Sequence, residues 1–182
     1  SSSYVDPDYI WVMANKRGAT TIGKASLTIS RNTINDPYNP TRGSKIWITG
    51  AIAGLGGDNY FYSAEGGIDW FHPIVGDLVL NLRGEAGLVR AYNSNNKGWG
   101  VPLHERLFVG GLNTLRGFER GMAGPVDDEK VAIGALNMVS FQAELLYPLS
   151  KAIGWRGAVF YDVGKGWGHE SSPEWGSIDD PS

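Results

Sequence analysis

Apolar and polar residues alternate with a period of two along most of the chain. In one stretch, Asn81, Arg83 and Glu85 share one face, and Leu80 and Leu82 share the other. The same alternation runs through six segments, which are residues 22–31, 44–53, 60–72, 77–90, 135–147 and 153–164. A period of two is the pattern of a β-strand with two different faces. The alternation therefore predicts an all-β, antiparallel fold.

The predicted strands are long for a globular domain. They run to about 9–13 residues, whereas a mean globular strand has ~5–6 and a tilted membrane-spanning strand needs ~9–11. One face carries charges of both signs with hydroxyls and amides, as a barrel lumen would. Aromatic residues near the segment ends, as in the girdles of membrane barrels, are Tyr60, Tyr62, Trp70, Phe71, Tyr147, Trp155 and Trp167. These features favour a transmembrane β-barrel segment; a soluble β-sandwich or soluble barrel with a hydrated outer face is the alternative.

The composition narrows the class of protein further. The 182 residues carry a formal net charge of −3, which argues against a nucleic-acid partner bound through phosphate neutralisation. The absence of cysteine excludes disulfide scaffolds and thiolate zinc sites. No apolar run reaches the ~18 residues of a transmembrane helix, and the first residues do not have the pattern of a signal peptide.

One connector is much longer than the others. The short ones contain Pro, Gly and Asn and are typical of tight turns. Residues 91–134 exceed the ~12–15 residues that are common for a structureless loop, and they place Leu107, Phe108 and Leu115 among many glycines. We expect this loop to fold back onto the protein, into a barrel lumen.

The whole chain, residues 1–182, is predicted to form one partial barrel domain. Its parts are an extracellular loop with a short helix (1–20), four strands (21–90), the long loop (91–134), two strands (135–168) and a final loop (169–182). The helix is expected between Pro7 and Gly18, because proline suits its first turn and glycine its end.

Motifs of enzymes and cofactor sites are missing from the sequence. It contains neither a P-loop nor a nucleophile elbow. His72, His104 and His169 are isolated from one another, so the sequence predicts no metal site. We therefore expect no enzyme activity, no cofactor and no metal.

One set of charged residues does have a reason to meet. Arg116 lies in the long loop, and Glu144 and Asp162 fall on the polar face of the two following strands. A guanidinium offers five donors in a fixed fork, which suits two carboxylates at once. Gly117 would permit close backbone approach, and Phe118 would wedge against the wall. We predict that these five residues anchor the loop; independently solvated charges are the alternative.

Several motifs resemble those of one protein family. Residues 105–121 (ERLFVGGLNTLRGFERG) resemble the F-x-G-G-x-x-[ST]-[VL]-R-G-[FY] signature of the BamA-type outer-membrane insertases, the bacterial surface antigen family. Residues 141–148 (FQAELLYP) are similar to its strand with an inward Glu, and residues 158–167 (AVFYDVGKGW) to its F-x-D-x-G-x-x-W strand. Residues 31–43 (RNTINDPYNPTRG) are similar to its periplasmic turn, with a departure at residues 33–35. The resemblance covers most of residues 20–168.

The resemblance implies a 16-stranded barrel, within the range of about 8 to 26 strands known for outer-membrane barrels. The six strands would be the eighth to thirteenth, and the sixth extracellular loop would fold inside. In the family, the loop arginine binds inward carboxylates of the next two strands, a role that falls to Arg116, Glu144 and Asp162. Closure needs about eight strands, so we expect the chain to be a fragment of a longer barrel.

The resemblance also implies a function and a location. The function is the folding and insertion of β-barrel proteins, and the location is the bacterial outer membrane. The implied partners are outer-membrane lipids, unfolded outer-membrane proteins and, through periplasmic domains missing from this chain, lipoproteins of the assembly machinery. One alternative is a two-partner secretion or translocation-assembly barrel that exports polypeptide. Another is a soluble all-β ligand-binding module that uses Trp47, Trp99 and Trp175.

Overall fold

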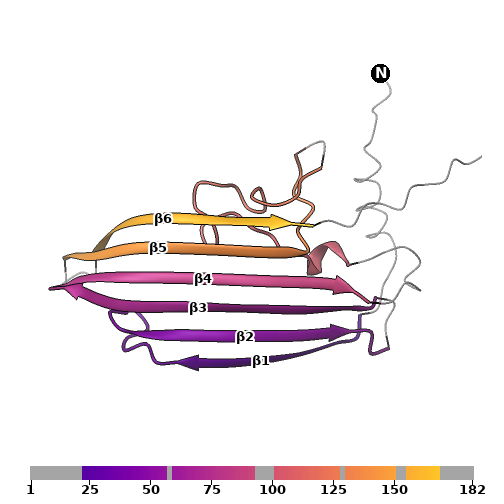
Figure 1. The fold of residues 1–182 in the computed structure, drawn as a ribbon, viewed down its shortest axis with the longest axis horizontal. Helices are drawn as coiled ribbons and strands as arrows, with labels where there is room; N and C mark the ends of the chain where they lie inside the picture. Colours follow the sequence, from indigo (N-terminus) through magenta and orange to yellow (C-terminus); the bar gives the residue numbers. More distant parts are fainter. Residues whose placement is uncertain (1–21, 57–58, 93–100, 128–129, 151–154, 169–182) are drawn as a thin grey trace, which may run out of the picture.

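The chain forms a single antiparallel sheet in the computed structural model, which describes residues 22–56, 59–92, 101–127, 130–150 and 155–168. The strands are β1 (Lys24–Asn32), β2 (Gly43–Ala53), β3 (Phe61–Val75), β4 (Leu78–Ala91), β5 (Asn137–Ser150) and β6 (Trp155–Trp167). They pair in sequence order, each antiparallel to its neighbour (Figure 1). The all-β antiparallel arrangement is the one that the alternation predicts. The expected helix within residues 1–20 and the expected final loop, 169–182, lie outside the described residues.

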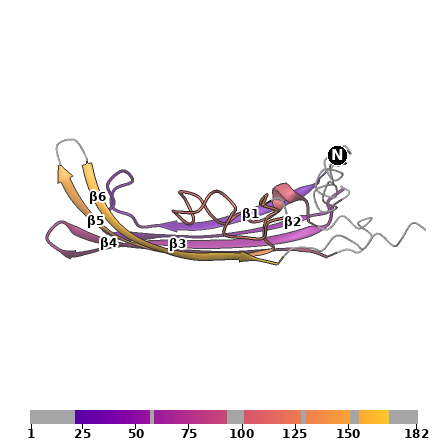
Figure 2. The same ribbon diagram turned by 90° about the horizontal axis from the view of Figure 1, so that it is seen from above.

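The sheet is strongly curved, so its two faces differ in what they meet. Figure 2 shows the long loop on the concave side and nothing covering the convex side in the part of the chain that the structure describes. Large apolar side chains are exposed on the convex side, among them Leu27, Ile29, Ile48, Ile68, Phe141, Val159, Tyr161 and Val163. An exposed apolar face with a polar opposite face is the pattern of a sheet whose outer surface meets lipid.

Three strands continue further than the alternation predicts. The sequence predicts strand ends at residues 72, 147 and 164, but β3 reaches Val75, β5 reaches Ser150 and β6 reaches Trp167. In β3 and β5 the register shifts just after a proline, Pro73 or Pro148. A bulge lets the strand continue past a residue that has no N–H for the ladder.

The turn between β1 and β2 reaches across the concave side. Its conformation is fixed by Asn35, whose Oδ1 accepts the N–H groups of Thr41 (3.1 Å) and Arg42 (3.0 Å). The guanidinium of Arg156, on β6, donates to the carbonyl of Pro40 at 3.3 Å. Because β1 and β6 stand at opposite ends of the strand order, this contact is possible only when the sheet curls.

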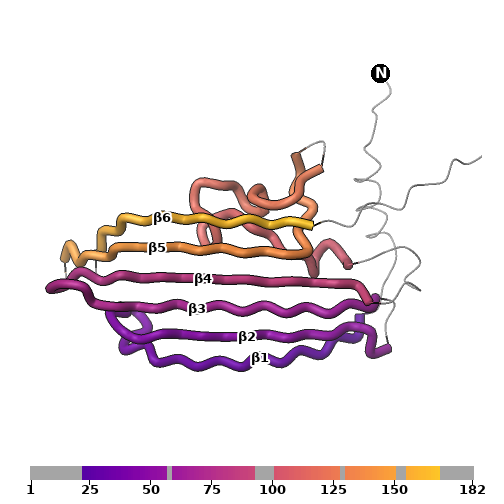
Figure 3. The backbone as a smooth tube through the Cα atoms, viewed as in Figure 1, coloured from indigo at the N-terminus to yellow at the C-terminus, as the bar shows by residue number. Residues whose placement is uncertain are grey.

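The long loop folds onto the concave face near the ends of β3, β4 and β5. Residues 101–127 and 130–136 of the loop contain the short helix η1 (Leu103–Glu105) and three isolated bridges, including Leu107 with Ala135. Figure 3 traces this part of the chain beside β5 and β6. No helix among the described residues is long and apolar enough to span a membrane.

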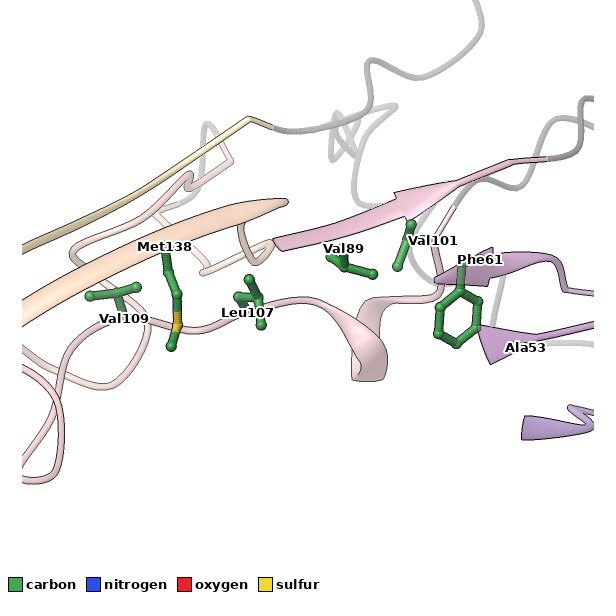
Figure 4. Packing of buried hydrophobic residues seen from close by; sticks show 7 residues of the cluster. All are labelled: Ala53, Phe61, Val89, Val101, Leu107, Val109 and Met138. Carbon is green, nitrogen blue, oxygen red and sulfur yellow. The ribbon is translucent and has the colours of Figure 1, made fainter. Parts of the chain in front are cut away.

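A cluster of buried apolar side chains joins the loop to the sheet (Figure 4). The strands contribute Ala53, Phe61, Val89 and Met138, and the loop contributes Val101, Leu107 and Val109. Burying apolar surface stabilises a contact by about 25 cal/mol per Å². Val101, Leu107 and Val109 of the loop are therefore buried against the sheet, as expected for a loop that folds back onto the protein.

Candidate functional site: the anchored loop

Arg116 sits at the point where the loop meets β5 and β6. Its Nε and Nη2 donate to Oδ2 and Oδ1 of Asp162 at 2.7 and 2.6 Å, and its Nη1 donates to Oε1 of Glu144. Its backbone N–H also donates to Oδ2 of Asp162, at 3.0 Å. The guanidinium thus binds one carboxylate with two donors and a second carboxylate with another, which is the geometry its planar fork favours.

The two carboxylates come from adjacent strands. Asp162 on β6 pairs in register with Gln142 on β5, and Glu144 pairs with Phe160, so the two acids are diagonal neighbours on the concave face. The side chain of Asp162 is only 3% exposed, whereas those of Arg116 and Glu144 are each 20% exposed. A nearly buried carboxylate needs a positive partner, and Arg116 is the partner that it has.

The ring of Phe160 lies beneath the guanidinium. The Cζ atom of Arg116 is 3.8 Å from the ring centroid, within the range of a cation–π contact. The hydrogen bonds to Asp162 and Glu144 raise the pKa of the Arg116 guanidinium above its ordinary value. An arginine is not deprotonated in proteins, so Arg116 meets the two carboxylates as a cation.

Gln142 holds the turn that precedes Arg116. Its side-chain amide donates to the carbonyls of Thr114 (2.9 Å) and Asn113 (3.4 Å), and the residue is 4% exposed. Neither Gln142 nor Phe160 is among the site residues predicted from the sequence. Their one signal is position: both lie on the polar face, opposite the predicted acids in the register.

The structure revises the reasons for two of the predicted residues. A Cβ on Gly117 would have no neighbour within 4 Å, so close approach does not explain this glycine. Its φ of 88° does, because that backbone conformation favours glycine. Phe118 is 52% exposed, so about half of it is covered, and its carbonyl accepts the N–H of Gly111 at 3.0 Å.

Further contacts tie other parts of the loop to the sheet. At its beginning, the Nζ of Lys24 on β1 forms an ion pair with Glu105 and lies 5.8 Å from the ring centroid of Phe61. At its end, the guanidinium of Arg90 on β4 donates to the carbonyl of Leu136 (2.9 Å) and to Oδ1 of Asn137 (2.6 Å). The loop is thus attached from β1 to β6.

The site is built to hold a segment of chain in place. Its polar atoms are engaged with one another, and no group of three or more His, Asp or Glu among the described residues could hold a metal ion. Long strands, an apolar convex face and a loop clamped on the concave face together define a segment of a transmembrane β-barrel with an inward-folded loop.

Comparisons with known proteins give the family. The profile of the Omp85 superfamily domain matches residues 1–182. The outer membrane protein assembly factor BamA of Neisseria meningitidis is 32% identical over 151 residues, which are 79% of this chain and 19% of that protein. A SAM50-like protein of Schizosaccharomyces pombe is 30% identical over 69% of this chain and 26% of its own length. The chain belongs to the Omp85 superfamily.

A solved structure has the same fold. It is the crystal structure of BamA from Haemophilus ducreyi lacking POTRA domains 1–3, with a TM-score of 0.68 and 27% identity over 79% of this chain and 30% of that one. The predicted family and the predicted barrel-type sheet are therefore confirmed, and the sheet is not closed within the described residues. The predicted location in the bacterial outer membrane is confirmed by the same relationships. The chain spans about a fifth of the length of the BamA relatives.

Proposed function

We propose that this chain is part of an outer-membrane assembly factor that folds β-barrel proteins and inserts them into the membrane. The observation that carries the proposal is the Arg116 anchor, which holds a long loop against the inside of a curved, lipid-facing sheet. Three BamA proteins among the relatives are named as assembly factors, and the alignments cover 79%, 94% and 81% of this chain.

The role assigned to the anchor is mechanical. The proposed activity makes and breaks no covalent bond; it lowers the barrier for a new strand to leave water and pair in the membrane. A protein with this role must keep its own sheet in one shape while the strands of the substrate protein pair in the membrane. Arg116 joins β5, β6 and the loop, so it fixes the position of the loop relative to the sheet.

The partners follow from that role. The convex apolar face requires outer-membrane lipid, and the substrates would be unfolded outer-membrane proteins. Lipoproteins of an assembly machinery would bind through periplasmic domains. The role requires neither a cofactor nor a metal.

Reconstitution of the full-length polypeptide that carries this sequence tests the proposal. It is inserted into liposomes, an unfolded outer-membrane barrel protein is added, and the folding rate is measured. The wild type should accelerate folding, and Arg116→Ala should lose most of the acceleration. Arg120→Ala is the matched control, because Arg120 lies in the same loop, is exposed, and has no side-chain partner among the described residues.

Three outcomes would count against the proposal. If the wild type does not accelerate folding, this protein is not an assembly factor. If the added polypeptide instead becomes protease-protected inside the liposome without folding into the bilayer, the exporter alternative is correct. If Arg116→Ala keeps the full acceleration, the anchor is not what supports the activity.

A further inference from the structure

The convex face of the sheet carries few charged side chains, and all of them are positive. Residues that pair across strands share a face, so the registers assign every strand position to one of the two faces. In the six described strands, the charged residues at convex positions are Arg31, Arg90 and Lys165, and no Asp or Glu is among them. Charge in contact with hydrocarbon is unfavourable, and its cost falls toward the membrane surface. The three cations therefore belong at the level of the lipid headgroups.

Two of the three cations lie at the same end of the sheet. Arg90 is near the end of β4 and Lys165 is near the end of β6, and these two strands run in the same direction (Figure 1). Arg31 lies at the opposite end, where β1 enters the turn to β2. Outer-membrane barrels have short periplasmic turns and longer extracellular loops. The end with the long loop is therefore the extracellular end, and Arg90 and Lys165 face the outer leaflet of the membrane.

The side chains of both residues approach β5, which runs between their strands. The guanidinium of Arg90 donates to the carbonyl of Leu136 at 2.9 Å and to Oδ1 of Asn137 at 2.6 Å. Asn137 pairs in register with Trp167, which makes Lys165 its diagonal neighbour on β6. Diagonal neighbours of an antiparallel pair are about 7–8 Å apart. The two cations thus meet over β5, which has a partner strand on each side, and their proximity does not depend on an edge of the sheet.

Neither of these two cations has a carboxylate partner among the described residues. Arg90 donates only to uncharged oxygens, which are those of Asn137 and of two backbone carbonyls. Lys165 is exposed, and its side chain has neither an ion-pair nor a hydrogen-bond partner in the described part of the chain. On the concave face, by contrast, Lys24 and Arg83 each pair with a carboxylate. The positive charge over β5 is therefore left for a negative group from outside the sheet.

Aromatic side chains mark the depth of this positive patch. Tyr62 pairs in register with Arg90, and Trp167 lies two residues beyond Lys165 on the same face. Both aromatic side chains are exposed. Tyr and Trp rings with this placement sit at the level of the headgroups in a membrane. The patch therefore lies where the phosphate groups of the lipids are.

We propose that Arg90 and Lys165 bind the phosphate group of a lipid in the outer leaflet, on the convex face over β5. Lipids that face the outside of a bacterial outer membrane carry negatively charged phosphates, and basic clusters at a membrane surface bind such headgroups. The planar fork of Arg90 and the flexible ammonium of Lys165 can donate to different oxygens of one phosphate. This inference rests on the outer-membrane location and not on the proposed assembly activity.

Photo-crosslinking to lipid tests this site locally. The full-length polypeptide that carries this sequence is placed in nanodiscs of phosphatidylcholine with a small fraction of lipid A that has two phosphates. A photo-crosslinking residue replaces Val139, which pairs in register with Lys165 and is exposed on the convex face. Mass spectrometry of the adducts gives the enrichment of lipid A over its share of the bilayer. The wild-type patch should give clear enrichment, and its absence would overturn the proposal.

Charge-removing variants assign the enrichment to the two cations. Arg90→Gln and Lys165→Gln should each lower it about fivefold. Arg31→Gln is the matched control, because Arg31 is a convex cation at the opposite end of the sheet, and it should leave the enrichment unchanged. Equal effects of Arg31→Gln and Lys165→Gln, or no effect of Lys165→Gln, would contradict the site.

A charge-conserving variant separates lipid binding from the contacts of Arg90 with the loop. Arg90→Lys loses the guanidinium hydrogen bonds but keeps the charge, so the enrichment should stay within about twofold of the wild type. A loss as large as that of Arg90→Gln would show that the structure at the end of the loop matters and the charge does not. If Arg90→Gln does not fold, Lys165→Gln decides, because its side chain has no partner among the described residues.

Two further arms identify the ligand. Lipid A from which the phosphates have been removed should show no enrichment, and inorganic phosphate should not displace bound lipid A. Equal enrichment of the phosphate-free lipid would mean that acyl chains alone are recognised. Full displacement by inorganic phosphate would mean that the site takes the free ion, and either result would overturn the assignment to a lipid phosphate.

Discussion

The loop is held by two ion-paired anchors that differ in their surroundings. At one end of the sheet, Arg116 binds Asp162 and Glu144 with four hydrogen bonds, and the Asp162 side chain is 3% exposed. At the other end, Lys24 binds Glu105 with a single ammonium, and the Lys24 side chain is 34% exposed. Exposed pairs contribute about 0–1 kcal/mol, whereas removing one partner of a buried pair costs about 3–5 kcal/mol. The ion pair of Arg116 is therefore expected to contribute more to the free energy of unfolding than the ion pair of Lys24.

The largest effect is expected for Arg116→Ala. The change leaves the carboxylates of Asp162 and Glu144 near each other without a positive partner, and the free energy of unfolding should fall by about 3 kcal/mol. Urea unfolding in detergent micelles, followed by tryptophan fluorescence, measures it. Arg120→Ala should stay within about 0.5 kcal/mol of the wild type. A loss in Arg116→Ala no larger than in this control would show that the anchor does not hold the loop.

Leu107→Ala tests the apolar contact between the two anchors. Leu107 is a loop residue in the buried apolar cluster that joins the loop to the sheet. Its truncation should lower the free energy of unfolding by about 2–3 kcal/mol. The same urea titration measures this loss. Leu112→Ala is the matched control, because Leu112 is in the same loop and is 86% exposed. Equal losses for the two leucines would mean that the loop does not pack on the sheet.

A smaller effect is expected for Gln142→Leu. The substitution keeps the size of the side chain but removes the donor to the carbonyls of Thr114 and Asn113, at a cost of about 1–2 kcal/mol. The turn before Arg116 should become more accessible, which limited proteolysis of the loop would detect. A cleavage rate equal to that of the wild type would remove Gln142 from the anchor.

The smallest effect is expected for Lys24→Ala. Its ion pair with Glu105 is partly exposed, so the free energy of unfolding should change by less than about 1 kcal/mol and the difference should shrink in high salt. Urea titrations at low and high salt measure both quantities. A loss as large as that of Arg116→Ala would contradict the contrast between the two anchors.

Alternation along the chain carries most of what the sequence predicts about the fold. It predicts each of the six strands, and it places Glu144 and Asp162 on one face because the side-chain period of a strand is two. It misses where β3, β5 and β6 end. In β3 and β5 the reason is that a proline normally argues against a strand, and only the pairing shows the bulges after Pro73 and Pro148. Strand ends depend on neighbours that a local pattern does not contain.

The Arg116 anchor is also partly predictable, because the alternation places its two acids on one face of the sheet. Arg116 has a chemical reason to meet two carboxylates, and the resemblance supplies the pairing. The contacts of Lys24 with Glu105 and of Gly166 with Ala123 join residues far apart in sequence through an irregular loop. No periodicity describes such a loop, so its contacts become visible only in three dimensions.

A double-mutant cycle between Arg116 and Asp162 tests the central claim most directly. Urea unfolding is measured for Arg116→Ala, Asp162→Ala and the double variant, beside the equivalent cycle for Lys24 and Glu105. The coupling free energy should be about 2 kcal/mol or more for Arg116 with Asp162, and below about 0.5 kcal/mol for Lys24 with Glu105. Equal coupling free energies in the two cycles would contradict an account in which Arg116, bound to the nearly buried Asp162, holds the loop inside the curved sheet.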